Sequence, residues 1–253
     1  MNEVIRLLKN RMSLRKYSDE KITEEELDLI LQNTLRAPTA GNMMLYSIIV
    51  VKDEKKKEVL SKTCDNQPFI KNADTILIFL ADLRRWYDYY KFSKVEEFCK
   101  EKEIEYKTPD EGDFLLSTQD AIISAQTSAI VCESLNIGSC YIGDIIENYE
   151  THKELFNLPK WTAPVCMLCI GKYENNKRII KPRFKKEYIV FNEEYKRLDD
   201  KALKDMFKDK NISENNIYGA KNFGQFNYAR KTGADFSKEM GRSVRSMIKE
   251  WNS

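Results

Sequence analysis

Three short segments of the sequence carry residue types that suit an anionic or planar ligand. Arg11-Met12-Ser13-Leu14-Arg15 flanks a hydroxyl with two guanidinium groups, and Lys181-Pro182-Arg183 places two cations around a stiffening proline. Such groups bind phosphate well. In the segment 138–144, Gly143 would let the backbone approach a flat ligand. Taken singly, each segment also has an ordinary structural interpretation: a basic helix end, a basic loop, and a helix cap at Gly138 followed by a short strand.

Composition excludes several other chemistries. The chain of 253 residues has one histidine, His152, so a histidine-rich zinc site and a HExxH metalloprotease are both absent. Its 9 glycines form neither a GxGxxG nor a GxxxxGK[ST] nucleotide-binding motif. We expect His152, which lies in a charged stretch, to be a surface residue. If the protein is an enzyme, we expect a cofactor rather than its own side chains to supply the reactive chemistry.

The six cysteines do not predict a metal site or a disulfide scaffold. Cys166-Met167-Leu168-Cys169 has CxxC spacing. In a strand, however, positions i and i+3 point to opposite faces, so the two thiols would not share a ligand. We therefore expect buried core cysteines.

The charge balance and hydropathy limit the class of partner. Forty-two Lys and Arg residues against 40 Asp and Glu give a net charge of +2, so the chain lacks the basic field that nucleic-acid binding requires. No apolar run approaches the roughly 20 residues of a membrane span, and no signal peptide is evident. We expect a cytoplasmic protein with neither a nucleic-acid nor a membrane partner.

Hydrophobic periodicity predicts the elements that must position these motifs. Thr23 and Glu26 form a capping-box pattern, which predicts a helix that runs to about residue 35. Runs of β-branched and aliphatic residues predict strands over 46–51, 75–81 and 164–171. Further helices are predicted over 2–11, 52–60, 118–136 and 236–251, the third rich in small residues that allow close helix packing.

Residues 84–113 differ from their surroundings and are predicted to form a helical excursion. They begin with five aromatic residues between 86 and 92 and continue as a dense run of mixed charge. The aromatic side chains either pack together or line a lid, and the sequence is compatible with both. Because no internal repeat or linker is visible, we predict one domain over 1–253 with a C-terminal arm over 185–253.

Four segments, in this order, resemble motifs of the nitroreductase family, and in particular its group-A type, which contains flavin reductases. Residues 11–17 (RMSLRKY) resemble its RRSxRxF signature, and 37–42 (APTAGN), with the strand that follows, resemble its APSSxNxQ loop. Residues 120–144 resemble its alanine-rich helix and following turn, and 181–184 (KPRF) resemble its KPR motif. The resemblance covers about residues 1–195.

The resemblance implies an FMN cofactor and assigns residues to its phosphate. The family pattern places four side chains there: Arg11, Ser13, Lys181 and Arg183. This agrees with the chemistry of a phosphate dianion, which takes several cations and a hydroxyl donor. Arg15 would reach the N1/O2 side of the flavin, where a fixed cation stabilises the negative charge that arrives with hydride. No other side chain is assigned a catalytic role.

The same pattern assigns residues to the flavin ring. Gln67 would bind the pyrimidine edge. The ribityl chain and ring edge would be lined by Thr39, Ala40 and Asn42. The ring near N5 would be covered by Tyr141, Ile142, Gly143 and Asp144, with backbone N–H groups as donors.

The sequence departs from the family pattern at three of these positions. Ala40 stands where the family has a serine, Met44 where it has a glutamine, and Asp144 where close relatives often have a second glycine. The C-terminal segment also leaves the nicotinamide nucleotide open. The 2′-phosphate of NADPH would meet Arg242 and Arg245, and Arg230 or Lys231 would also serve. The alternative is that these cations form a solvated helix face.

The resemblance also implies a fold and an activity. It implies an α+β protein with a central, mostly antiparallel sheet wrapped by helices, and a homodimer with FMN at its interface. A C-terminal arm would reach the partner, and the 118–136 helix would contribute to the interface. The implied enzyme transfers hydride from NAD(P)H through FMN to nitroaromatic, quinone or flavin acceptors by a ping-pong mechanism. The alternatives are a flavin storage or redox-sensing protein with little turnover, or a related FMN enzyme such as a reductive dehalogenase.

Overall fold

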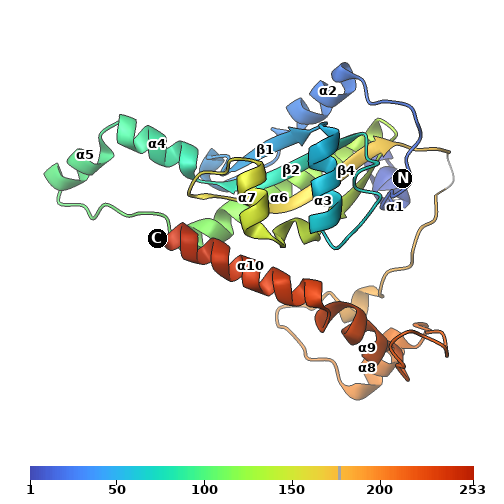
Figure 1. The fold of residues 1–253 in the computed structure, drawn as a ribbon. Helices are drawn as coiled ribbons and strands as arrows, with labels where there is room; N and C mark the ends of the chain where they lie inside the picture. The colour runs from blue at the N-terminus through green and yellow to red at the C-terminus, as the bar shows by residue number, and fades with distance from the viewer. Residues whose placement is uncertain (176–177) are drawn as a thin grey trace. The chain divides into compact units, whose positions relative to one another are not determined.

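The computed structural model describes residues 1–175 and 178–253. These residues divide into two compact units. The first unit comprises Met1–Ile179 and Glu239–Ser253, and the second comprises Ile180–Lys238. The sheet lies entirely in the first unit (Figure 1). None of the helices in the described ranges is long and apolar enough to cross a membrane.

A four-stranded antiparallel sheet forms the centre of the first unit. Its order is β1-β2-β4-β3, with strands β1 (Tyr46–Val51), β2 (Thr75–Asp82), β3 (Ile137–Ile142) and β4 (Thr162–Lys172). The sheet confirms the predicted α+β fold. Three strands were predicted as such, whereas β3 was only one of two interpretations of its segment.

The sheet is buried on both faces because successive strand residues join different hydrophobic clusters. In β4, Cys166 and Leu168 face α6 (Glu111–Ser134) and α2 (Glu24–Thr34), whereas Met167 and Cys169 face the side of α3 (Glu54–Thr63). Figure 1 shows α6 and α3 on either side of the sheet. The CxxC cysteines are therefore buried on opposite faces, as predicted.

The remaining elements of the first unit surround this three-layered core. They are α1 (Glu3–Asn10), η1 (Ala40–Asn42), α4 (Arg84–Phe92), α5 (Val95–Glu101), η2 (Gly143–Ile146), α7 (Tyr149–Leu155) and α10 (Asp235–Asn252), whose residues from Glu239 onward belong to this unit. The second unit contains η3 (Lys186–Tyr188), α8 (Asp200–Phe207), α9 (Phe223–Asn227) and a short π-helix, η4 (Tyr228–Thr232).

Helix α6 begins earlier than predicted, at Glu111 rather than residue 118. Asp110 and Asp113 form a capping box there, which satisfies the first backbone N–H groups of the helix. The small side chains of α6, predicted to help form a dimer interface, pack instead against the chain's own sheet, and Ala121 and Ala125 are fully buried. Those side chains are therefore not available to a partner. The outward face of α6 carries exposed apolar residues, namely Leu115, Leu116, Ile122 and Ile123.

His152 is buried, so the prediction of a surface residue is wrong. Its side chain is 0% exposed. Its two ring nitrogens lie 2.9 Å from the Ile145 carbonyl and 2.8 Å from Thr63 Oγ1. Burial lowers the pKa of His152, so the ring is neutral near pH 7. Its charged sequence neighbours Glu150 and Glu154 lie on the exposed face of α7, and they made the whole segment look like a surface segment.

The 84–113 excursion is helical only in part. It contains α4 and α5, which extend away from the sheet in Figure 1, and then an irregular stretch before α6. Trp86 and Tyr87 pack against the core beside β1, whereas Phe92 is 84% exposed. The aromatic run thus packs at its start and points to solvent at its end.

Candidate functional site

The segment from Arg11 to Arg15 is extended and lies beside the edge strand β3. Ser13 forms a parallel bridge to Ser139, and Leu14 N donates to Ser139 O at 3.0 Å. In an extended chain, alternate side chains face the same way. Leu14 is buried at 6% exposure, so this alternation places Arg11, Ser13 and Arg15 on the opposite side. We call these three residues the basic row.

Gly138 makes this close approach possible. It lies within β3, so its predicted role as a helix cap is wrong, and Asn136, with φ of 55°, takes the left-handed position after α6. A Cβ atom at Gly138 would lie 2.8 Å from Leu14 Cβ and 2.9 Å from Tyr173 Cζ. Glycine is therefore required for Leu14, and with it the basic row, to lie against the sheet.

The charges of the basic row have no carboxylate at ion-pair distance within the described residues. Arg11 donates to the carbonyl of its neighbour Met12 at 3.4 Å, and Arg15 lies over the Phe69 ring at 5.6 Å. The adjacent Ser139 hydroxyl is buried and has no hydrogen-bond partner among the described residues. Two guanidinium groups and two hydroxyls, with no described carboxylate at ion-pair distance from the guanidinium groups, are a donor set that fits a phosphate.

The turn after β3 brings together the residues predicted for the flavin ring. Tyr141 and Ile142 end the strand, and Gly143 and Asp144 begin η2. No heavy atom lies within 4 Å of a Cβ built at Gly143, so its backbone borders open space. The Asp144 carboxylate accepts a hydrogen bond from Gln67 Nε2 at 2.8 Å. Gln67 and the 141–144 segment therefore lie side by side.

The Gln67 amide has one chemically consistent orientation. Its nitrogen donates to the Cys64 carbonyl at 3.0 Å as well as to Asp144. Because a carbonyl and a carboxylate only accept, the NH₂ group must face them. The Gln67 carbonyl oxygen remains to accept from a ligand N–H, such as that of a pyrimidine ring.

The loop over residues 39–45 is held by one buried carboxylate. Asp120 of α6 is 2% exposed and accepts from Ala40 N at 3.0 Å and from Leu45 N at 3.1 Å. Thr39 Oγ1 accepts from Met44 N at 3.2 Å. Asp120 thus fixes both ends of the loop that contains Thr39, Ala40 and Asn42.

The same loop needs this support because its backbone is unfavourable. Asn42 and Met44 have positive φ angles of 57° and 52°, which are uncommon for residues other than glycine. Helix α4 supplies two further anchors. Arg85 Nη2 donates to the Met44 carbonyl at 2.8 Å, and Trp86 Nε1 donates to the Met43 carbonyl at 2.8 Å.

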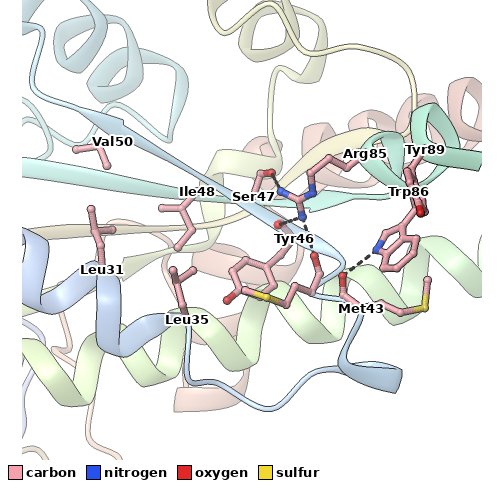
Figure 2. A pocket seen from close by; sticks show the side chains of 11 residues that line it. Leu31, Leu35, Met43, Tyr46, Ser47, Ile48, Val50, Arg85, Trp86 and Tyr89 are labelled. Atoms are coloured by element: carbon pink, nitrogen blue, oxygen red, sulfur yellow. Dashed lines mark hydrogen bonds between the residues drawn. The ribbon is translucent and has the colours of Figure 1, made fainter. Parts of the chain in front are cut away.

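An apolar groove of about 600 Å³ lies between α2, β1 and α4 (Figure 2). Leu31 of α2 and Leu35, which caps the end of that helix, form one wall, and Trp86 and Tyr89 of α4 form another. The guanidinium group of Arg85 at its rim is committed to backbone carbonyls and to Ser47, as the dashed lines in Figure 2 show. The groove runs beside the open edge of β1.

The basic row and the 39–45 loop lie at opposite corners of the sheet. The row flanks β3, where Ser139 pairs with Ile170 of β4, whereas the loop leads into β1, where Tyr46 is level with Ala163 of β4. From residue 163 to residue 170 the strand rises roughly 23 Å, and four strand spacings add roughly 19 Å laterally. One mononucleotide does not span that separation, so the two sets do not meet at one ligand within one subunit.

The remaining predicted cations fall into two groups. Lys181 and Arg183 lie in the second unit, and both are exposed. Arg242 of α10 is held by two carboxylates, with Glu150 at 2.9 and 2.7 Å and Glu239 at 2.8 Å. These ion pairs favour a structural role for Arg242, whereas Arg245 is exposed.

Sequence reasoning did not identify Asp120 or Arg85, which position the loop. The available signal for Asp120 is its place at the start of the 120–144 segment, where the family motif carries an acidic residue. Arg85 gives no signal in the sequence. The described residues contain no group of three or more His, Cys, Asp or Glu side chains placed to hold a metal ion.

Comparison with known proteins identifies the family to which the chain is similar. The Nitroreductase family profile matches residues 8–172. An FMN reductase (NADPH) of Bacillus subtilis is 31% identical over 197 residues, which cover 77% of this chain and 75% of the relative. An FMN reductase [NAD(P)H] of the same organism is 31% identical over 215 residues, covering 85% and 83%.

Solved structures show the same fold. The structure of B. megaterium NfrA2 is 28% identical, with a TM-score of 0.77, and the match covers 99% of this chain and 98% of that one. The motifs, the fold and the profile match lead to the same conclusion: the chain belongs to the nitroreductase family.

Proposed function

We propose that this protein is an FMN-dependent oxidoreductase that transfers hydride from NAD(P)H to a small-molecule acceptor. The family and the relatives named as FMN reductases support an FMN cofactor and NAD(P)H-dependent oxidoreduction. The structural observation that carries the proposal is the basic row. Its guanidinium groups have no carboxylate at ion-pair distance in the part of the chain that the structure describes, and the row flanks the same edge strand that ends in the open turn at Gly143.

The donors and acceptors of the site fit the phosphate, the pyrimidine edge and the N1/O2 side of FMN. Arg11 and Ser13 would hold the phosphate, and the Gln67 carbonyl would accept from the pyrimidine edge. When bound, FMN takes hydride from NAD(P)H and passes it to the acceptor. Arg15 would supply a fixed positive charge at the N1/O2 side, where negative charge accumulates.

The separation of the two residue sets supports a homodimer with the site at its interface. We propose that the basic row of one subunit and the 39–45 loop of its partner complete each FMN site. The chain also offers apolar surface for such an interface: the groove beside β1 and the outward face of α6. The C-terminal arm over 185–253 is proposed to reach the partner.

The acceptors proposed for the oxidative half-reaction are nitroaromatics, quinones and free flavins. A shared flavin face implies that the oxidised nicotinamide leaves before the acceptor binds, which is a ping-pong mechanism. Parallel double-reciprocal plots at several acceptor concentrations are the expected kinetic pattern.

The proposal is tested by cofactor content and turnover. The purified protein should bind FMN and oxidise NADPH or NADH when nitrofurazone or menadione is added. A protein that cannot be reconstituted with FMN would contradict the proposal. A yellow protein that does not oxidise NAD(P)H would favour flavin storage or sensing instead.

Arg15→Ala should lower the flavin midpoint potential and slow flavin reduction, because the fixed cation that favours the reduced form is lost. The expected shift is about 30 mV for each tenfold loss of preference for reduced flavin. Lys16→Ala is the matched control, since Lys16 is adjacent in sequence but paired with Glu174 at 2.9 Å. Spectroelectrochemical titration measures both, and equal potentials in the two variants would remove Arg15 from this role.

A further inference from the structure

A buried carboxyl group lies next to the residues predicted to bind the flavin ring. Glu147 follows η2, and its backbone N–H donates to the Asp144 carbonyl at 3.0 Å. The residue is 4% exposed, and its Oε1 atom has no hydrogen-bond partner among the described residues. A buried carboxylate with an oxygen that receives no hydrogen bond is costly, which favours the protonated form of this group.

The surroundings of Glu147 are acidic, and no cation within residues 1–175 and 178–253 lies at ion-pair distance from it. The groups that face it come from η2, from the end of α3 and the loop after it, from α7 and from α10: Asp144, Cys64, Asp65, His152 and Glu239. His152 is neutral, and Glu239 is ionised because Arg242 holds its pKa at about 2. Arg242 is itself shared between Glu239 and Glu150.

These surroundings decide the protonation of Glu147. Burial raises the pKa of its carboxyl group to about 8, and the charge of Asp144 and a hydrogen bond between the two side chains add to this effect. A hydrogen bond between two carboxyl groups requires a proton on one of them. Near pH 7, Glu147 is therefore the member of the pair that carries the proton.

The proton is connected to the candidate flavin site through Asp144. The Asp144 carboxylate also accepts from Gln67 at 2.8 Å, which directs the Gln67 carbonyl oxygen toward the ligand side. A hydrogen-bonded chain therefore runs from buried Glu147 through Asp144 to the Gln67 amide.

We propose that Glu147 and Asp144 form a carboxyl pair that holds one proton beside the flavin site and thereby fixes Gln67 for FMN. Glu147 is a positioning residue in this account, because it acts through Asp144. The inference rests on the proposed FMN-dependent function. It adds a proton-linked control of cofactor binding to that function.

Loss of the proton places two negative charges in the pair. The repulsion weakens the contact between Asp144 and Gln67 and adds a negative charge near the flavin ring. Both effects oppose FMN binding, and they oppose binding of the reduced, more negative cofactor most strongly. The dissociation constant of FMN should therefore rise as the pH passes through the titration range of Glu147.

The test is the FMN dissociation constant between pH 7 and 9.5, measured by quenching of flavin fluorescence. The wild type should weaken about tenfold, the scale expected for one charge acting at about 10 Å through an effective dielectric constant of about 20. Glu147→Gln keeps the shape and a hydrogen-bond donor, so its constant should stay flat and low. Glu154→Gln makes the same change at an exposed position and should follow the wild type.

A second measurement keeps the inference separate from the proposed function. Infrared spectra of the full chain should show a protonated carboxyl band at pH 7 that is lost at pH 9.5 and is absent from Glu147→Gln. Parallel pH profiles for FMN binding in the wild type and Glu147→Gln would overturn the inference, as would a missing carboxyl band. Failure to bind FMN at any pH, with the band present, would overturn the proposed function instead.

Discussion

Asp120→Ala should raise the FMN dissociation constant at least 100-fold and destabilise the fold. The substitution removes the acceptor from the part-buried backbone N–H group of Ala40 and from the buried one of Leu45. Each unpaired group costs about 1–3 kcal/mol. The 39–45 loop, with its positive φ angles at Asn42 and Met44, would lose the contact that fixes it. Fluorescence titration with FMN and urea unfolding measure the two effects.

Two further variants distinguish a local effect of the 39–45 loop on FMN binding from a general loss of stability. Gln119→Ala removes an exposed side chain next to Asp120 on the same helix and should change neither quantity. Asp120→Asn keeps one acceptor oxygen but replaces the other with NH₂, so it should give an intermediate FMN affinity. Wild-type affinity in Asp120→Ala, with the loss of stability present, would show that the loop does not contact FMN.

Gly138→Ala should displace the basic row and is the second large effect expected. The new Cβ would lie 2.8 Å from Leu14 Cβ and 2.9 Å from Tyr173 Cζ, so Leu14 must move away from β3. Arg11, Ser13 and Arg15 move with it, because they belong to the same extended segment. We expect a destabilisation of about 1–3 kcal/mol and a loss of FMN affinity of tenfold or more.

Gly143→Ala provides the matched control for stability. No heavy atom lies within 4 Å of its added Cβ, so the unfolding free energy should stay within about 0.5 kcal/mol of wild type. If Gly138→Ala unfolds at the same urea concentration as Gly143→Ala, the close approach of Leu14 to β3 is not as described.

The sequence predicts the elements with long, regular patterns and the residue types of the site. The apolar runs identify β1, β2 and β4, and the capping box at Thr23 identifies the start of α2. The resemblance names the residues of the basic row. It does not show that they project from an extended segment, because a five-residue alternation is too short to distinguish from a helix end.

Other features depend on tertiary contacts that a single sequence does not display. The small residues of α6 suit either a partner helix or the chain's own sheet, and only the packing shows that they face the sheet. In the sequence, Glu147 looks like an ordinary polar residue, and Asp120 is marked only by its place in the family motif. The role of Asp120 comes from the 39–45 loop, which the fold places against it. The role of Glu147 comes from its contact with Asp144. His152 was misassigned for the same reason, since its partners Thr63 and Ile145 come from other elements.

The central claim is that each FMN site takes its basic row from one subunit and its 39–45 loop from the other. A mixed dimer tests it most directly. One copy carries Arg11→Ala with Arg15→Ala, the other carries Asp120→Ala, and different affinity tags on the two copies allow the mixed species to be purified. Each variant alone should retain almost no FMN.

The measurement is the FMN content of the mixed dimer. If the site is shared, one of its two sites combines the intact row of one copy with the intact loop of the other. The dimer should then retain about one FMN. If the basic row and the 39–45 loop of one subunit form the same FMN site, both sites of the mixed dimer carry a defect. A mixed dimer without FMN would therefore contradict the shared site.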